Sequence, residues 1–168
     1  MQLSNLVDLS QLLVAITVVV GTVFGLLQLS EFKRQRREST AGELMRSFMS
    51  VEFARAQAIV MRLPDGIPAA DLRSLGSEVE QAAVLVCTTC ESMGVMVFER
   101  ITPFPLVLNL AGGLVVVLWR KLEPWVVELR KEQSNPADSE WFQWLAHQCE
   151  QRKSTTLPAY VIHRNWKP

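Results

Sequence analysis

The chain has 168 residues, which is enough for one domain and a membrane anchor and too few for two independent domains. Its 17 Lys and Arg residues balance 17 Asp and Glu residues, and this neutral charge disfavours a nucleic-acid binder, which needs positive charge to offset phosphates. Three cysteines, an odd number, predict no disulfide framework and fit a reducing compartment.

The first predicted element is a transmembrane helix over residues 9–30, behind a short external N-terminus of residues 1–8. The stretch contains no charged side chain, and as a helix rising about 1.5 Å per residue it spans about 30 Å, the thickness of a hydrocarbon core. The alternative is a cleaved signal peptide, which carries basic residues before its apolar run. Here the basic residues follow the run, so we expect an uncleaved anchor.

A basic juxtamembrane segment, residues 31–38, follows the anchor. Its basic residues are Lys33, Arg34, Arg36 and Arg37. By the positive-inside rule, these charges place the N-terminus outside the inner (cytoplasmic) membrane and the rest of the chain in the cytoplasm. We expect them to meet membrane lipid headgroups. A nucleic-acid patch is the weaker alternative, because Glu31 and Glu38 flank the four charges.

Small residues recur along the predicted anchor at Thr17, Gly21 and Gly25. Their spacing of four places them on one helix face. Such a face lets a second helix approach closely, which favours association in lipid, where no hydrophobic drive brings helices together. We expect it to contact the membrane helix of a second copy or of another membrane protein.

The pattern after the basic segment predicts a helical domain over residues 39–153 and an extended polar tail over residues 154–168. Ser50 precedes an apolar periodic run and predicts a helix N-terminus. The run ends at Pro64-Asp65-Gly66, which is a turn signal, and Pro68 begins a short helix that Gly76 ends.

The most apolar stretch of the domain is residues 77–101, and it begins with Ser77 and Glu80 at capping-box spacing. Its apolar residues run nearly all round the helix, so we expect a central buried helix. Thr102-Pro103 breaks the chain, and a second apolar helix is predicted over Leu106–Trp119.

Residues 101–119 carry no charge, which leaves a second membrane span or a membrane-dipping helix as an alternative. Two prolines, Asn109 and the Gly112-Gly113 pair shorten the useful apolar helix to about fourteen residues, a length more typical of a core helix. The glycine pair predicts close helix packing. Pro124 predicts a kink or a boundary.

The last predicted helix follows the Asn135-Pro136 turn and is amphipathic, with Trp141, Trp144 and Leu145 on one side. No alternating strand pattern of useful length appears. The fold class that we expect is therefore all-α, with one N-terminal transmembrane helix followed by a cytoplasmic helical bundle.

Cysteines form the first candidate for chemistry, because Cys87 and Cys90 make a CTTC pair. A zinc site would need two further ligands, such as His147 and Cys149. A redox CxxC normally lies at a helix start, whereas this pair lies mid-helix. We expect the two residues to be small hydrophobic side chains of the core.

Glu91 lies inside the apolar helix, where a carboxylate is either a proton-linked site or a group that is exposed or paired with an Arg such as Arg100 or Arg120. Neither His147 nor His163 has the partner spacing of a catalytic dyad or triad. No catalytic, nucleotide-binding or metal-binding motif is present, so we expect no enzymatic activity, no cofactor and no metal.

Four of the five tryptophans lie in the last 45 residues. An indole ring is apolar and its N–H is polar, so Trp is favoured at protein interfaces and at the water–lipid boundary. The candidates for a protein interface are Trp141, Trp144 and Trp166.

Several segments of the chain resemble a bacterial family of unknown function, DUF4760. They are EFKRQRRE, LMRSFMSVEFARA, TTCESMGVMVFERITPFPLV, and LWRKLEPWVVELRKEQSNP followed by WFQWLA. The resemblance covers most of residues 10–150 and implies a bacterial membrane-anchored helical protein. It implies no activity and no site residues.

These observations favour a non-enzymatic membrane-anchored subunit or scaffold that assembles with itself or with a larger membrane protein complex. The alternative is a membrane-tethered sensor or regulator whose helical domain binds a small ligand or lipid in a hydrophobic pocket beside Leu106–Trp119. A third hypothesis is an enzyme or metal protein built on Cys87, Cys90 and Glu91.

Overall fold

The computed structural model describes residues 17–25, 28, 42, 46, 50–153 and 157–167, and all regular secondary structure in these residues is helical. The all-α class is confirmed for this part of the chain. The chain divides into two compact units, Met1–Thr40 and Ala41–Pro168, and each is described by itself.

Residues 17–25 of the first unit form a helix that contains the predicted small-residue face. Space is open beside Gly21 and Gly25, since a β-carbon added at either residue meets nothing within 4 Å. The large apolar side chains of this helix are exposed by 52% to 62%. The predicted headgroup contacts Lys33, Arg34, Arg36 and Arg37 lie outside the described residues.

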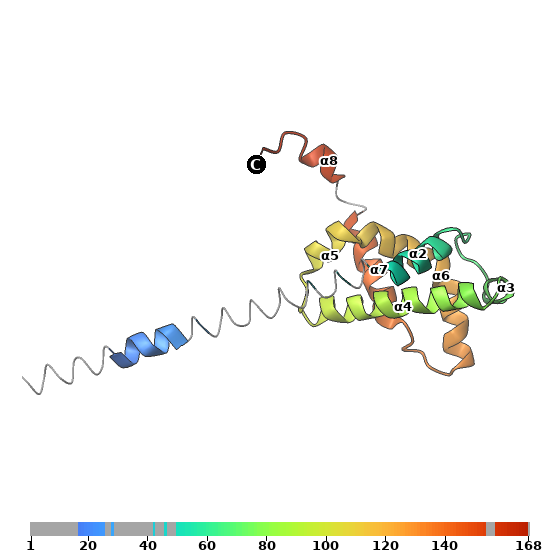
Figure 1. The fold of residues 1–168 in the computed structure, drawn as a ribbon, viewed down its shortest axis with the longest axis horizontal. Helices are drawn as coiled ribbons and strands as arrows, with labels where there is room; N and C mark the ends of the chain where they lie inside the picture. The colour runs from blue at the N-terminus through green and yellow to red at the C-terminus, as the bar shows by residue number, and fades with distance from the viewer. Residues whose placement is uncertain are drawn as a thin grey trace, which may run out of the picture. The chain divides into compact units, whose positions relative to one another are not determined.

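The helices of the second unit are labelled in Figure 1. They are α2 (Val51–Met61), α3 (Ala69–Ser74), α4 (Ser77–Phe98), α5 (Phe104–Leu110), α6 (Gly112–Glu132), α7 (Glu140–Lys153) and α8 (Ala159–Ile162).

Four of these helices form a ring around the core. α4 packs against α2 and α7, and α6 completes the ring because it packs against the same two helices. Each helix contributes a large, fully buried side chain to the centre: Phe53 from α2, Met93 from α4, Trp125 from α6 and Phe142 from α7. A helix in such a ring buries one side and leaves the other side outward.

Of the two helix N-caps predicted from the sequence, at Ser50 and at Ser77, one is confirmed. Ser50 caps α2 as expected, since its Oγ accepts a hydrogen bond from the Phe53 N–H at 3.1 Å. The capping box predicted at Ser77 and Glu80 is wrong, because Gly76 is the N-cap of α4 and Ser77 is its first helical residue. Gly76 has a φ of +103°, which a glycine adopts without strain where the chain turns from α3 into α4.

Pro124 lies inside α6, so the predicted boundary there is wrong. A proline lacks the N–H that would bond the carbonyl four residues earlier, which is that of Arg120. The Gly66 N–H of the predicted turn donates to this carbonyl at 3.0 Å. The turn after α2 therefore satisfies the group that the proline leaves without a partner, and α6 continues.

The predicted helix Leu106–Trp119 is interrupted at Ala111, and α5 and α6 meet at an angle of 74°. Gly112 confirms the expected close packing, since an added β-carbon would lie 3.0 Å from Leu108 and 3.4 Å from the Cys149 sulfur. Residues 101–119 are therefore not one straight helix.

Among the described helices, α4 is the single helix long and apolar enough to cross a membrane by length and composition, and α5 with α6 passes the same test only if the bent pair counts as one span. Part of α4 is core, since 44% of its most apolar window is buried inside the domain. The tail contains the short helix α8, although its sequence lacks helical periodicity.

Candidate functional site

The outward side of α4 is the most unusual surface of the domain. Beyond the first turn of the helix, where Ser77 and Glu78 are exposed, its exposed residues are Gln81, Val84, Leu85, Thr88, Ser92, Val95 and Phe98, and we call these seven the α4 face. Phe98 is 53% exposed and Val84 is 49% exposed. The face runs for about 25 Å at the helical rise of 1.5 Å per residue. The expectation that α4 is buried nearly all round is wrong for this side.

The hydroxyl groups of the α4 face need no hydrogen bonds from water, because they donate to carbonyl groups of the same helix. Thr88 donates to the Val84 carbonyl at 2.9 Å, and Ser92 donates to the Thr88 carbonyl at 2.9 Å. Between Gln81 and Phe98 the sequence contains one charged residue, Glu91. A long, uncharged face with satisfied hydroxyls is suited to packing against another helix.

An aromatic cluster lies at the C-terminal end of the face. Phe98 contacts Trp141 of α7 with tilted rings at 4.4 Å, centroid to centroid, and Trp144 meets both rings edge-on at 6.0 Å. Trp141 and Trp144 are each partly exposed. The structure thus brings these two predicted interface residues together beside the α4 face, whereas Trp166 lies in the tail and is 71% exposed.

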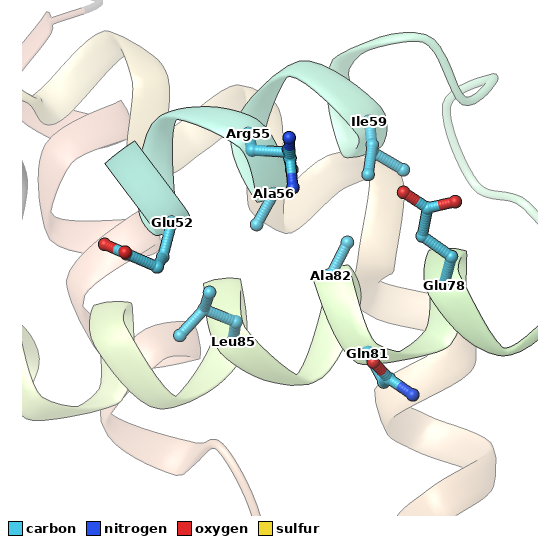
Figure 2. A pocket seen from close by; sticks show the side chains of 8 residues that line it. All are labelled: Glu52, Arg55, Ala56, Ile59, Glu78, Gln81, Ala82 and Leu85. Atoms are coloured by element: carbon cyan, nitrogen blue, oxygen red, sulfur yellow. The ribbon is translucent and has the colours of Figure 1, made fainter. Parts of the chain in front are cut away.

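A groove between α2 and α4 borders the face at its N-terminal half. Figure 2 shows the two helices side by side, with Ala56 and Ala82 pointing toward each other across the gap. The hollow has a volume of about 270 Å³. Its other lining residues are Glu52, Arg55, Ile59, Glu78, Gln81 and Leu85. We call it the α2–α4 groove.

Glu91 caps the N-terminus of α7. Its carboxylate accepts a hydrogen bond from the Phe142 N–H at 2.7 Å and another from the Trp141 N–H. These are orphan donors of the first helical turn, and the helix dipole also favours a negative charge there. Among the described residues Glu91 forms no ion pair with Arg100 or Arg120, so the predicted arginine partner is wrong.

Burial raises the pKa of Glu91 above its ordinary 4.5, although the bonds from Phe142 and Trp141 oppose this shift. The folded state therefore holds a proton at pH values where the unfolded chain has lost it. The free energy of unfolding contributed by this group falls as pH rises from about 4.5 through the raised pKa.

We expect Glu91→Gln and Glu91→Ala to distinguish the stability that comes from the capping hydrogen bonds from the effect of the carboxylate charge. Glutamine keeps an oxygen for the Phe142 N–H and does not ionise, so at neutral pH it should unfold no more easily than the wild type and should lose this part of the pH dependence. Alanine leaves buried N–H groups unpaired and should cost about 1–2 kcal/mol. Urea unfolding across acid and neutral pH measures both, and equal losses in the two variants would contradict the capping role.

The cysteines lie in the core, as expected. Cys87, Cys90 and Cys149 are buried and free of disulfides. Burial raises the pKa of Cys87 to about 12 and that of Cys149 to about 11, so the thiols stay protonated. His147 is exposed, and among the described residues no three His, Cys, Asp or Glu side chains converge on one point.

Two features of this surface have no local signal in the sequence. The pairing of Glu91 with α7 joins residues 51 positions apart, and the α2–α4 groove depends on how two helices pack. The α4 face, in contrast, had a signal in the sequence. Its uncharged positions are visible there, but we interpreted them as part of the core.

Together these features describe a small all-α domain with an exposed, uncharged α4 face and an aromatic cluster at one end of that face. The chain belongs to the family described as a domain of unknown function, DUF4760, whose model matches residues 15–149. No curated protein matches the chain, and no solved structure matches it.

Proposed function

We propose that this protein is a non-enzymatic, membrane-anchored subunit that assembles with a second copy or with a larger membrane protein complex by helix packing. One observation carries the proposal: the α4 face is uncharged, its hydroxyls are satisfied within the helix, and it is nevertheless exposed. Covering such a face releases apolar surface from water while its hydroxyls stay paired.

The aromatic cluster supports the same role. Trp141 and Trp144 beside Phe98 offer large, rigid apolar area with polar edges, which is the composition of interface anchors. Membrane placement belongs to the proposal. Residues 9–30 form the anchor, with the N-terminus outside and the helical domain in the cytoplasm, and Thr17, Gly21 and Gly25 add a second contact within lipid.

The sensor alternative predicted a hydrophobic pocket between the 77–101 helix and Leu106–Trp119. The hollow that we describe lies instead between α2 and α4, and charged side chains stand on its rim. This position favours a docked polypeptide over a small apolar ligand, so we retain the assembly role.

Thr88→Arg tests the proposal, because Thr88 lies in the middle of the α4 face. An arginine there would have to be desolvated at a helix–helix contact, which costs roughly 3 kcal/mol, so we expect association to weaken at least about 100-fold. The matched control is Glu123→Arg on the exposed side of α6, which should leave association unchanged.

The measurement is native mass spectrometry of the full chain extracted in lipid nanodiscs, with circular dichroism showing that both variants stay folded. A wild-type particle that is strictly monomeric and free of partners would overturn the proposal. So would a Thr88→Arg protein that assembles as the wild type does.

A further inference from the structure

The C-terminal segment, Leu157–Lys167, exposes its large apolar side chains to solvent. Tyr160 is 81% exposed, Trp166 is 71% exposed and Ile162 is 51% exposed. Tyr and Trp are the side chains that most often anchor a docked segment. Their exposure on so short a stretch is typical of a segment that docks on another surface.

The charge of this segment is of one sign. No acidic residue follows Glu150 in the sequence, whereas Arg164 and Lys167 lie among the exposed apolar residues of the segment. A surface that binds the segment should therefore combine an apolar floor with acidic side chains.

The α2–α4 groove has this combination. Its floor is made by Ala56 and Ala82, and Glu52 and Glu78 stand at its two ends, as Figure 2 shows. None of the ion pairs among the described residues involves either glutamate. Arg55 is the one basic side chain of the lining, so the rim has a net charge of about −1.

A single copy leaves both surfaces unused. The groove is hollow and the segment is exposed in the same chain. Exchange between two copies would fill two grooves with two segments, in the reciprocal manner of a two-fold symmetric pair. The groove also shares Gln81 and Leu85 with the α4 face, so the exchange would extend the same contact.

We propose that Leu157–Lys167 of one copy docks in the α2–α4 groove of a second copy. Tyr160 and Trp166 supply aromatic anchors for the apolar floor, and Arg164 and Lys167 pair with Glu52 and Glu78. This proposal rests on the proposed assembly role in one respect, since it requires that two copies of the chain associate. The groove lies within the residues that the family model matches, and the segment lies outside them.

Cross-linking of the full chain in nanodiscs tests which copy is bound. Two populations are mixed, one carrying a photo-cross-linking amino acid in place of Trp166 and the other carrying heavy isotopes. We expect cross-links from position 166 to heavy-isotope peptides of α2 and α4. Cross-links confined to the same chain, to lipid or to other surfaces would overturn the proposal.

A charge-reversal cycle gives an independent readout. Glu52→Lys with Glu78→Lys should weaken self-association about tenfold, and Arg164→Glu with Lys167→Glu should do the same. Mixing the two variant chains should restore association, because opposite charges face each other again. Glu123→Lys, away from the groove, is the control and should change nothing.

The outcomes separate the two proposals. If Thr88→Arg dissociates the assembly while the charge reversals and the cross-links show no effect, only the docking of the segment is wrong. If the wild-type chain is monomeric without partners, both proposals are wrong.

Discussion

Gly94→Ala is expected to destabilise the helical domain by about 3 kcal/mol, because α4 and α7 touch backbone to backbone at this position. A β-carbon on Gly94 would lie 2.7 Å from the carbonyl carbon of Trp141 and 2.8 Å from its β-carbon, and closer still to its carbonyl oxygen. These are groups that a side-chain rotation cannot move. The two helices would have to separate, and the cap from Glu91 would be disturbed with them.

Urea unfolding of the full chain in detergent, followed by tryptophan fluorescence, measures this loss. Gly42→Ala is the matched control, since Gly42 is also helical and has open space around it. Alanine is the better helix former, so the control should be unchanged or more stable by up to about 1 kcal/mol. Equal stability of Gly94→Ala and the wild type would mean that α4 and α7 are not in the close contact described.

Lys121→Ala is expected to cost about 2–3 kcal/mol, because Lys121 holds the turn after α2 against α6 from a buried position. The side chain is 10% exposed, and its Nζ donates to the Leu63 carbonyl and pairs with Asp65 at 3.0 Å. Alanine would leave a buried carbonyl without a donor and would empty the space of the lysine stem.

Arg120→Ala is the matched control on the neighbouring residue. Arg120 reaches the same Asp65 at 3.6 Å, but its side chain is 55% exposed, so the substitution should cost less than about 1 kcal/mol. Thermal unfolding of both variants, with circular dichroism as the signal, compares them directly. Similar losses would show that the turn is held by charge alone and that the burial of Lys121 is irrelevant.

The pH dependence of this contact has the opposite sign to that of Glu91. The hydrogen bond from Lys121 is the main cause that lowers the pKa of Asp65 below its ordinary 3.8. The stabilisation is therefore present above that pH and is lost as pH falls through the lowered pKa. In Lys121→Ala this acid-dependent part of the stability should be smaller, with the part due to Arg120 remaining.

Both substitutions concern the scaffold that presents the α4 face. Gly94 sets how closely α7 lies beside α4, and so where Trp141 stands next to Phe98. Lys121 and Gly66 tie the end of α2 to α6, which positions one wall of the α2–α4 groove. A loss of stability in these variants should therefore be accompanied by weaker association.

Local chemistry in the sequence was enough to predict most of the helices and several of their ends. Ser50, the Pro64-Asp65-Gly66 turn and the Thr102-Pro103 break each act through bonds or dihedral angles within a few residues, so their effect needs no knowledge of the fold. The same holds for the core role of Cys87 and Cys90, since small apolar side chains on an apolar helix are buried in most arrangements.

Only the tertiary structure decided which side of α4 stays outward, because burial on a helix depends on where its neighbours pack. The apolar residues of α4 lie on nearly all sides, so the sequence pattern did not distinguish the buried side from the exposed one. It also decided the partner of Glu91, the donor for the carbonyl released by Pro124, and the break at Ala111. Each of these joins groups far apart in the chain or depends on the space left by another helix. The physical reason is common to all: capping, packing and exposure are properties of pairs of helices, whereas the sequence pattern describes one helix at a time.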